Sequence, residues 1–215
     1  AGFTVIPVTG RPAGWCDMIL RQWPVGAVIG ENGAFTDYFD GADKRRFFHP
    51  EVPKERLNER LSEIREACLR EVPGCQVSQD QSYRVCDLAI DFNEDVHLGL
   101  PAAEKIAAIA HAHGAVAKIS SIHVNIWFGN YTKVGMAELF LREKLHLTAP
   151  ERQVIFFGDS PNDGPMFAHI PLSVGVANIR PFEKSLSHHP QFVTEGEGGL
   201  GFAVAAKILN DLKNS

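Results

Sequence analysis

The most constraining feature of this sequence is a short apolar run that ends in a glycine and two closely spaced carboxylates. Residues 154–157 read Val-Ile-Phe-Phe, and residues 158–163 continue as Gly-Asp-Ser-Pro-Asn-Asp. Valine, isoleucine and phenylalanine in a short run favour a strand that is buried on both faces, as in a parallel sheet. Gly158 then allows a sharp turn at the carboxyl end of that strand.

The two carboxylates of this stretch predict a metal site. Asp159 is expected in the crevice at the strand end, where open α/β sheets bind ligands. Asp163 follows one helical turn later, so both carboxylates can face the same point. Two hard oxygen donors suit Mg²⁺, which usually also takes phosphate oxygens of a substrate. The alternative is an acidic turn that caps a helix beginning at Pro161 and Asn162.

Composition limits the class of protein. The chain has 215 residues, enough for one large domain or two small ones, with the hydrophobic and charged fractions of an ordinary globular protein. A net charge of −5 argues against a broad nucleic-acid-binding face. No apolar run reaches the ~20 residues that span a bilayer, and no signal peptide is visible. We therefore expect a cytoplasmic protein with neither nucleic acid nor a membrane as partner. The four cysteines lack C-x-x-C spacing. We therefore expect reduced thiols rather than a disulfide or zinc framework.

A second candidate site stands near the start of the chain. Residues 3–8 predict a short strand, which ends in Thr9, Gly10 and Arg11. A hydroxyl, a glycine N–H and an arginine at a strand's carboxyl end can together hold a phosphate. Pro12 is expected to open a helix. The alternative is a Thr-Gly turn beside a solvated arginine.

The elements that follow predict a parallel sheet with an insertion. Residues 25–29 form a second apolar run, so the order is strand, helix, strand, the unit of a parallel sheet. From residue 36 to about 128 the chain is more charged and has its own elements. These comprise helices over 53–70 and 101–113, and strands over 84–92, 115–120 and 122–128. We interpret residues 36–128 as an α+β cap.

A third candidate is Lys133. Residues 130–133 lead into an amphipathic helix that is expected to run through Leu147, with Thr132 as N-cap. Lys133 then falls in the first turn, where the helix dipole disfavours a cation. This placement indicates an anionic group nearby, a phosphate or a carboxylate. The alternative is a flexible surface lysine.

Along the chain the candidates follow one another as Thr9–Arg11, Lys133 and residues 158–163. This ordered set, with the cap between the second and the third of the family's motifs, resembles the haloacid dehalogenase superfamily of phosphohydrolases. The closest type has a large α+β cap, as in sugar-phosphate and mannosylphosphoglycerate phosphatases. The resemblance implies an α/β fold with a Rossmann-like parallel-sheet core, formed by residues 1–35 and 129–215, and an inserted cap over 36–128.

The resemblance also implies roles for individual residues. Thr9 and the Gly10 N–H would bind the phosphoryl oxygens. Lys133 would neutralise the phosphoryl group and a nucleophilic carboxylate. The logic is that of phosphoryl transfer, in which positioning and charge stabilisation dominate.

Four further residues receive roles from the resemblance. Asp159 would ligate Mg²⁺, and Asp163 would bind a metal water or orient the lysine. Asn162 would assist in the same shell as a substrate-binding residue. Arg11 is a second substrate-binding candidate, although it could instead pair structurally.

One motif of the family does not stand in this sequence. A strand ending in Asp-x-Asp-x-Thr, which supplies the nucleophile and the general acid, should precede Thr9, and none of the first eight residues is acidic. Asp91 also ends a predicted strand, but it lies in the cap and lacks the following threonine. We therefore expect the nucleophile to lie N-terminal to residue 1, in a longer enzyme.

The expected function is a Mg²⁺-dependent phosphatase that acts on a small phosphorylated metabolite, a sugar phosphate, through an aspartyl-phosphate intermediate. Two alternatives stay open: a phosphomutase of the same superfamily, and a non-catalytic module that binds a phosphometabolite. In the cap, Arg84, Asp87 and His123 are polar candidates for substrate contact, each with a structural role as the alternative. The sequence predicts neither the exact phosphorylated metabolite nor the oligomeric state.

Overall fold

The computed structural model describes residues 2–214, which cluster into two compact units. The first unit is Thr4–Ala137. The second runs from Glu138 onward and includes the short segment that ends at Phe3. The boundary falls inside helix α4, Lys133–Glu143. The division into a core and a 36–128 cap follows different boundaries and stays a prediction.

The first unit begins with the predicted strand–helix–strand arrangement. Residues 5–9 run parallel to β1, Ala27–Gly30, and are joined to it by a bridge between Val8 and Ile29 and by hydrogen bonds such as Thr9 N–H to the Ile29 carbonyl at 2.9 Å. Helix α1, Ala13–Gln22, connects them. The predicted strand over 3–8 is thus an extended segment with one bridge, and the carbonyls of Val5 and Pro7 accept further hydrogen bonds from the N–H groups of Gly26 and Ile29.

Strand β1 also begins an antiparallel sheet of order β1-β2-β3. Strand β2 is Phe35–Asp40 and β3 is Asp43–Phe48. A short 3-10 helix, Glu31–Gly33, links β1 to β2. The hairpin is fixed by the fully buried Asp37, whose carboxylate accepts two hydrogen bonds from Arg46 at 2.6 and 2.7 Å. Such a bidentate pair offsets part of the cost of burying the charge.

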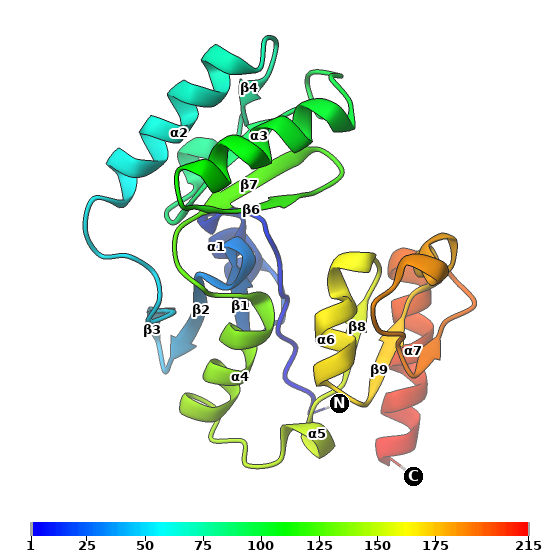
Figure 1. Ribbon diagram of the computed structural model, residues 1–215. Helices are drawn as coiled ribbons and strands as arrows, with labels where there is room; N and C mark the ends of the chain where they lie inside the picture. The colour runs from blue at the N-terminus through cyan, green and yellow to red at the C-terminus, as the bar shows by residue number, and fades with distance from the viewer. Residues whose placement is uncertain (1, 215) are drawn as a thin grey trace. The chain divides into compact units, whose positions relative to one another are not determined.

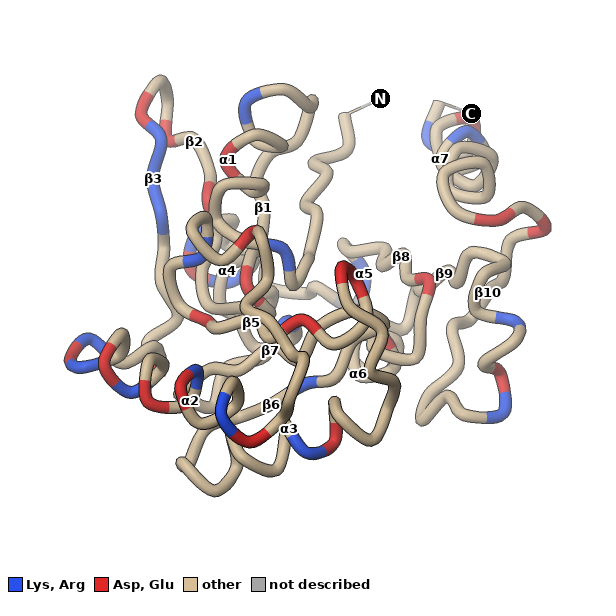
Figure 2. The backbone as a smooth tube through the Cα atoms, turned by 90° about the horizontal axis from the view of Figure 1, so that it is seen from above, with Lys and Arg blue, Asp and Glu red and all other residues tan. Residues whose placement is uncertain are grey.

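A second antiparallel sheet has the order β4-β5-β7-β6. Figure 1 shows helices α2, Leu57–Glu71, and α3, Leu100–Ala112, on the same face of it. The strands and these helices share one apolar core, which includes Ile64, Leu88, Ile90, Ile106, Val124 and Ile126. Charged residues of both signs follow one another along α2 (Figure 2). The bounds are Gln76–Val77 for β4, Asp87–Asp91 for β5, Val116–Ile119 for β6 and His123–Trp127 for β7.

The opposite face of this sheet is polar. Side chains alternate along a strand, so the neighbours of the core residues Leu88 and Val124 point away from α2 and α3. On β5 these are Asp87 and Asp91, and on β7 they include His123, which pairs with Asp91. All three are buried. Buried polar residues usually have hydrogen-bond partners. On this face Asp87 binds Arg84, which also binds the Gly10 carbonyl of the candidate site.

The second unit contains a parallel sheet of order β10-β9-β8, so the strand predicted from the apolar run at 154–157 is parallel as expected. Residues 154–157 are half-buried, however, so the predicted burial on both faces is wrong. Its strands are β8, Phe156–Gly158, β9, Ser173–Gly175, and β10, Phe192–Val193. Its α-helices are α5, Pro150–Gln153, α6, Gly164–His169, and α7, Gly198–Asn214. Two 3-10 helices of this unit span Pro161–Asp163 and Ala177–Ser185. A further 3-10 helix, Gln81–Tyr83, belongs to the first unit.

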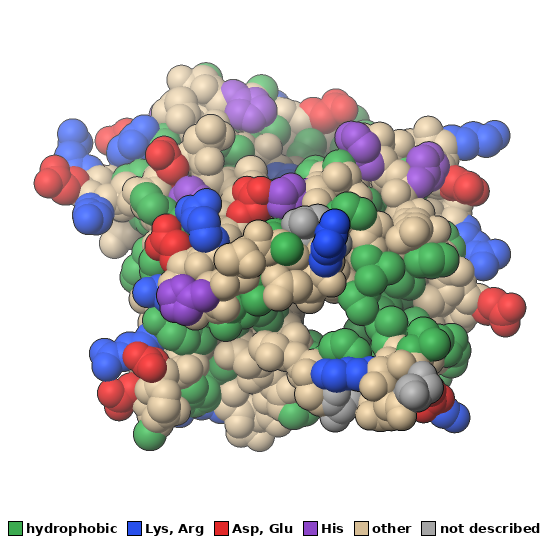
Figure 3. Space-filling model, turned by 90° about the horizontal axis from the view of Figure 1, so that it is seen from below, with side chains coloured by type: hydrophobic (Ala, Val, Ile, Leu, Met, Phe, Trp, Pro, Cys, Tyr) green, Lys and Arg blue, Asp and Glu red, His purple; other side chains and the backbone are tan. Residues whose placement is uncertain are grey.

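Three features limit what kind of surface the protein presents. Within residues 2–214, no helix is long and apolar enough to cross a membrane. Side chains of both charge signs are interspersed on the face shown in Figure 3, without a broad field of one sign. All four cysteines are free and buried.

Candidate functional site

The Thr9–Arg11 loop follows the segment that runs along β1. The Thr9 hydroxyl accepts a hydrogen bond from Arg11 N–H at 3.0 Å, which tightens the loop into a turn. The Thr9 carbonyl accepts one from Asn32 N–H at 3.1 Å. Among the described residues, the Gly10 N–H has no hydrogen-bond acceptor. The loop therefore presents a hydroxyl and a backbone donor, the groups that a phosphoryl oxygen needs.

A side chain at Gly10 would require the Asn32 side chain to move. A Cβ atom on Gly10 would lie 2.9 Å from the Asn32 Oδ1 atom and 3.4 Å from the Asn125 Nδ2 atom. Asn125 belongs to β7, on the polar face of the four-stranded sheet. Glycine at this position therefore lets the loop approach two side-chain amides closely.

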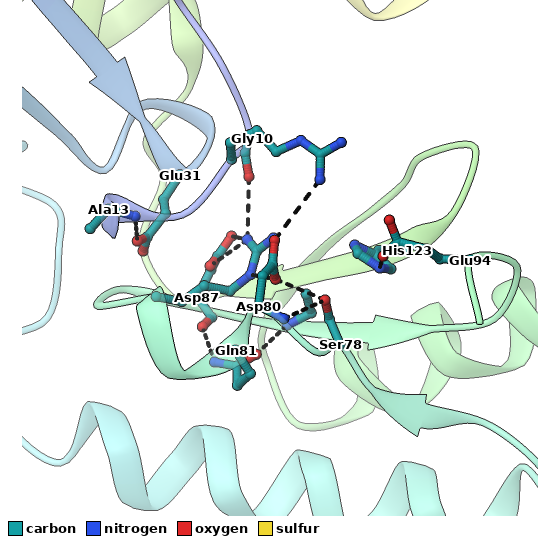
Figure 4. A network of polar contacts seen from close by, with 12 residues as sticks. Gly10, Ala13, Glu31, Ser78, Asp80, Gln81, Asp87, Glu94 and His123 are labelled. Carbon is teal, nitrogen blue, oxygen red and sulfur yellow. Dashed lines mark hydrogen bonds and ion pairs between the residues drawn. The ribbon is translucent and has the colours of Figure 1, made fainter. Parts of the chain in front are cut away.

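A buried arginine supports the loop from below. Figure 4 shows Asp80 and Asp87 below Gly10, and Arg84 forms hydrogen bonds to all three residues. Arg84 donates to both oxygens of Asp80 at 3.0 and 3.2 Å and to both of Asp87 at 3.0 and 3.1 Å. Its Nη1 atom also donates to the Gly10 carbonyl at 3.2 Å. Arg84 thus connects the Thr9–Arg11 loop to Asp87, the first residue of β5.

The pKa values of the two carboxyl groups in this network are shifted in opposite directions. Burial raises the pKa of Asp87 to about 7, because desolvation and the nearby Glu31 outweigh the opposing effect of Arg84. Burial also acts on Asp80, but there Arg84 holds the pKa below its usual value. Only 1% of the Arg84 side chain is exposed, so it does not reach a substrate directly. Its predicted alternative, a structural role, is what the geometry shows.

Arg11 lies at the edge of the same network. Its Nη1 atom is 4.0 Å from Asp80 Oδ2, and its guanidinium stands 5.2 Å from the centre of the Trp15 ring. The side chain is 44% exposed. An exposed ion pair of this length contributes little stability. Arg11 is therefore positioned by Asp80 and Trp15, and its predicted contact with substrate stays a prediction.

Glu31 is a buried carboxylate that ties three segments together. It accepts hydrogen bonds from Ala13 N–H at 3.0 Å, from Val85 N–H at 3.0 Å and from Cys86 N–H at 2.6 Å. Ala13 is the first residue of α1, so the carboxylate also meets the positive end of that helix. Burial raises the pKa of Glu31, while these hydrogen bonds lower it.

Lys133 begins α4, in the first turn as predicted. Thr132 caps the helix, since its hydroxyl accepts a hydrogen bond from Gly135 N–H at 3.0 Å. The helix ends at Glu143, earlier than the predicted Leu147. His146 there adopts a φ of 53°, a left-handed conformation that ends helices and that no glycine announces.

Asp159, Asn162 and Asp163 share one turn of the second unit. Asp163 is buried, and its Oδ2 atom accepts hydrogen bonds from Asp159 N–H at 2.9 Å and from Ser160 N–H at 3.2 Å. Asp159 and Asn162 are exposed. The capping turn considered as the alternative is therefore present. It leaves the role of Asp159 untouched, because Asp159 contributes only its backbone to these bonds.

The donor set of this turn fits Mg²⁺ better than a metal held entirely by protein. Among residues 2–214, no group of three or more histidine, cysteine, aspartate or glutamate side chains could hold a metal ion. Mg²⁺ commonly binds through one or two carboxylates, with water and phosphate oxygens completing its shell. Asp159 and Asp163 are the two carboxylates of this turn, and Asp163 Oδ2 also accepts hydrogen bonds from the backbone.

The predicted site residues fall into two groups. Thr9, Gly10, Arg11 and Lys133 belong to the first unit, and Asp159, Asn162 and Asp163 to the second.

Sequence reasoning missed Glu31 and Asp80 entirely. It also missed the partner of His123, whose Nε2 atom lies 2.8 Å from Glu94 Oε2. The partners of Glu31 and His123 are distant in sequence, whereas Asp80 pairs with Arg84 only four residues away, in a segment without a helical sequence pattern.

Comparisons with known proteins agree with the fold. The family model of haloacid dehalogenase-like hydrolases matches residues 101–200. No curated protein matches the sequence. A solved Thermoplasma acidophilum structure is 21% identical, with a TM-score of 0.72, and the alignment covers 97% of this chain and 84% of that one. A haloacid dehalogenase subclass IIB sugar phosphatase is 14% identical over 97% and 86% of the two chains, with a TM-score of 0.64.

The sucrose-phosphatase of Synechocystis, solved with sucrose and phosphate, is 16% identical over 97% and 84% of the two chains, also with a TM-score of 0.64. Identities this low establish the fold alone. Together with the match over residues 101–200, they agree with the resemblance: this chain has the α/β fold of the haloacid dehalogenase superfamily.

Proposed function

We propose that the protein is a Mg²⁺-dependent phosphatase that hydrolyses the phosphomonoester of a small metabolite, a sugar phosphate. The reaction would pass through an aspartyl-phosphate whose nucleophile lies N-terminal to residue 1. The titles of two structural neighbours, a subclass IIB sugar phosphatase and a sucrose-phosphatase, support the substrate class.

The observation that carries the proposal is the Thr9–Gly10 loop. It presents a threonine hydroxyl and a glycine N–H without another acceptor among the described residues, and Arg84 fixes its backbone from the buried side. Donors that are fixed in advance stabilise developing negative charge without having to reorganise during the reaction. This arrangement favours a phosphoryl group over a neutral ligand.

Each remaining residue has a defined task in this proposal. Thr9 and Gly10 donate to the phosphoryl oxygens, and Lys133 neutralises their charge. Mg²⁺, held by Asp159 with Asp163 beside it, would supply further charge stabilisation. Asn162 and Arg11 would be substrate-binding residues. In the four-stranded sheet, His123 is buried beside Glu94, which favours a structural role for it over contact with the sugar.

The test is phosphate release from a panel of phosphosugars, using the protein as encoded, with any residues that precede residue 1. Turnover with Mg²⁺ and its loss with a chelator are expected. Lys133→Ala should lower turnover by about 10²–10³-fold, the usual cost of one charge-stabilising group. A wild-type protein without activity on any phosphomonoester contradicts the proposal.

The two alternatives give different results in the same assay. A phosphomutase would isomerise a phosphosugar without releasing phosphate. A binding module would bind phosphosugars in calorimetry, with neither release nor isomerisation. The intact mass of the natural protein adds a direct check on whether residues precede residue 1.

A further inference from the structure

The Glu31–Gly33 turn has an unusual backbone. Three consecutive residues have positive φ angles, 43° at Glu31, 58° at Asn32 and 103° at Gly33. All three are buried. Non-glycine residues rarely adopt this conformation, and it persists only where the surroundings hold it. The turn is therefore held in place by specific contacts, and these contacts define what it does.

One side of the turn holds the Thr9–Arg11 loop. Glu31 N–H donates to the Arg11 carbonyl and Asn32 N–H to the Thr9 carbonyl, both at 3.1 Å. The two hydrogen bonds bracket Gly10. The Asn32 side chain packs against Gly10 itself, since a Cβ atom there would lie 2.9 Å from its Oδ1 atom. The position of the loop thus depends on the turn.

The other side of the turn holds the start of α4. A Cβ atom on Gly33 would lie 2.2 Å from the Thr132 carbonyl oxygen and 2.9 Å from the Lys133 backbone nitrogen. The backbone of Lys133 therefore packs directly on Gly33. No other side chain fits between them, because the obstructing atoms are backbone atoms that cannot rotate away.

The carboxylate of Glu31 anchors the whole arrangement. It is fully buried and accepts hydrogen bonds from the N–H groups of Ala13, Val85 and Cys86. These bonds fix the turn relative to α1 and to the start of β5.

We propose that Glu31, Asn32 and Gly33 are positioning residues that set the distance between the Thr9–Gly10 donors and Lys133. The turn makes backbone contact with both groups, so a displacement of one is transmitted to the other. This inference rests on the proposed function, because it gives Thr9, Gly10 and Lys133 a common phosphoryl group to hold.

The first test substitutes Gly33 and a matched control. Gly33→Ala should lower kcat for a phosphosugar by about 100-fold, the cost expected when a catalytic group is misplaced by about 1 Å. Gly41 also has a positive φ, of 61°, but a Cβ atom there meets nothing within 4 Å. Gly41→Ala therefore imposes similar backbone strain without the clash, and should leave kcat within twofold. Rates are normalised to the folded fraction, measured by circular dichroism.

A second variant covers the case in which Gly33→Ala does not fold. Asn32→Gly keeps the positive φ and removes the side chain that packs on Gly10. The Asn32 Nδ2 atom has no hydrogen-bond partner among the described residues, so the loss should cost little stability. We expect a Tm close to wild type, with kcat/KM lowered about 10-fold. Unchanged kcat/KM contradicts the positioning role.

A double-mutant cycle separates positioning from a general structural effect. If Gly33 acts through Lys133, the effect of Gly33→Ala on turnover should shrink to within about threefold in a Lys133→Arg background. If the wild-type protein is active, additive effects on turnover, or equal losses for Gly33→Ala and Gly41→Ala, overturn the positioning role and leave the proposed function intact. A wild-type protein without turnover instead contradicts the proposed function, and the positioning role with it.

Discussion

The two candidate loops are held in different ways. The Thr9–Arg11 loop is supported by residues from other segments, chiefly Arg84, whose side chain is almost fully buried, and Glu31. The Asp159–Asp163 turn is held by its own carboxylate, which accepts hydrogen bonds from two N–H groups of the same turn. The first loop should therefore depend on the fold of its whole unit. The second should respond mainly to changes within itself.

The two units that carry these loops also differ in how much apolar surface they bury. The first unit contains two apolar clusters that join helices to sheets. In the second unit, α7 buries only Gly201 and exposes Leu200 by 79% and Leu212 by 67%. Local opening requires less free energy where fewer apolar contacts are lost. We expect faster hydrogen exchange around β8 than around β5.

The largest effect is expected from Arg84→Met. It leaves Asp87 buried without its partner and removes the donor to the Gly10 carbonyl. Breaking such a buried pair costs about 3–5 kcal/mol of unfolding free energy. Urea unfolding measures the loss. The matched control Arg70→Met removes an exposed pair with Glu71 and should cost about 0–1 kcal/mol. Similar losses for both variants would show that the network does not support the loop.

A smaller effect is expected from Asp163→Ala. It removes the acceptor of the Asp159 and Ser160 N–H groups, which costs about 1–3 kcal/mol. The loss should be local, so hydrogen exchange at these two amides should accelerate more than exchange in β5. Asp163→Asn keeps an acceptor oxygen and serves as the control. Equal acceleration in β5 would mean that the turn is not self-contained.

A more gradual effect, of about 1 kcal/mol per pH unit, is expected from the titration of Asp87. Because the folded pKa of Asp87 is raised to about 7, the folded state binds more protons there than the unfolded state between about pH 4 and pH 7. This contribution to stability is complete below the unfolded pKa and is lost as the pH rises through about 7. The stability of wild type minus that of Asp87→Asn should fall by about 1 kcal/mol per pH unit in this window. Parallel pH profiles would contradict the raised pKa.

Much of the local structure could be predicted from the sequence. The helix predicted over 101–113 spans Leu100–Ala112, because its proline start and Gly114 end are local signals. The parallel strand before Asp159 and the N-cap at Thr132 follow from equally local patterns. The resemblance to the haloacid dehalogenase superfamily rests on such pieces in order, and the comparisons confirm it.

The supports of the candidate site could not be predicted in the same way. Glu31 binds the N–H groups of Val85 and Cys86, more than 50 residues further along the chain. Arg84 reaches the Gly10 carbonyl over a similar separation. Such contacts exist only after the chain has folded, and a glutamate before Asn-Gly reads as an ordinary turn residue. The boundary between the units inside α4 likewise has no sequence signal.

The most direct test of the account measures Asp159→Asn against wild type, by turnover and by thermal melting with and without Mg²⁺. If Asp159 is a metal ligand, the substitution removes one negative charge from the ion's shell. Turnover should fall by about 10²–10³-fold, and the Mg²⁺-induced rise in Tm should shrink. The Tm without Mg²⁺ should be retained or rise. An unchanged Mg²⁺-induced shift together with unchanged turnover would show that Asp159 is only part of a turn.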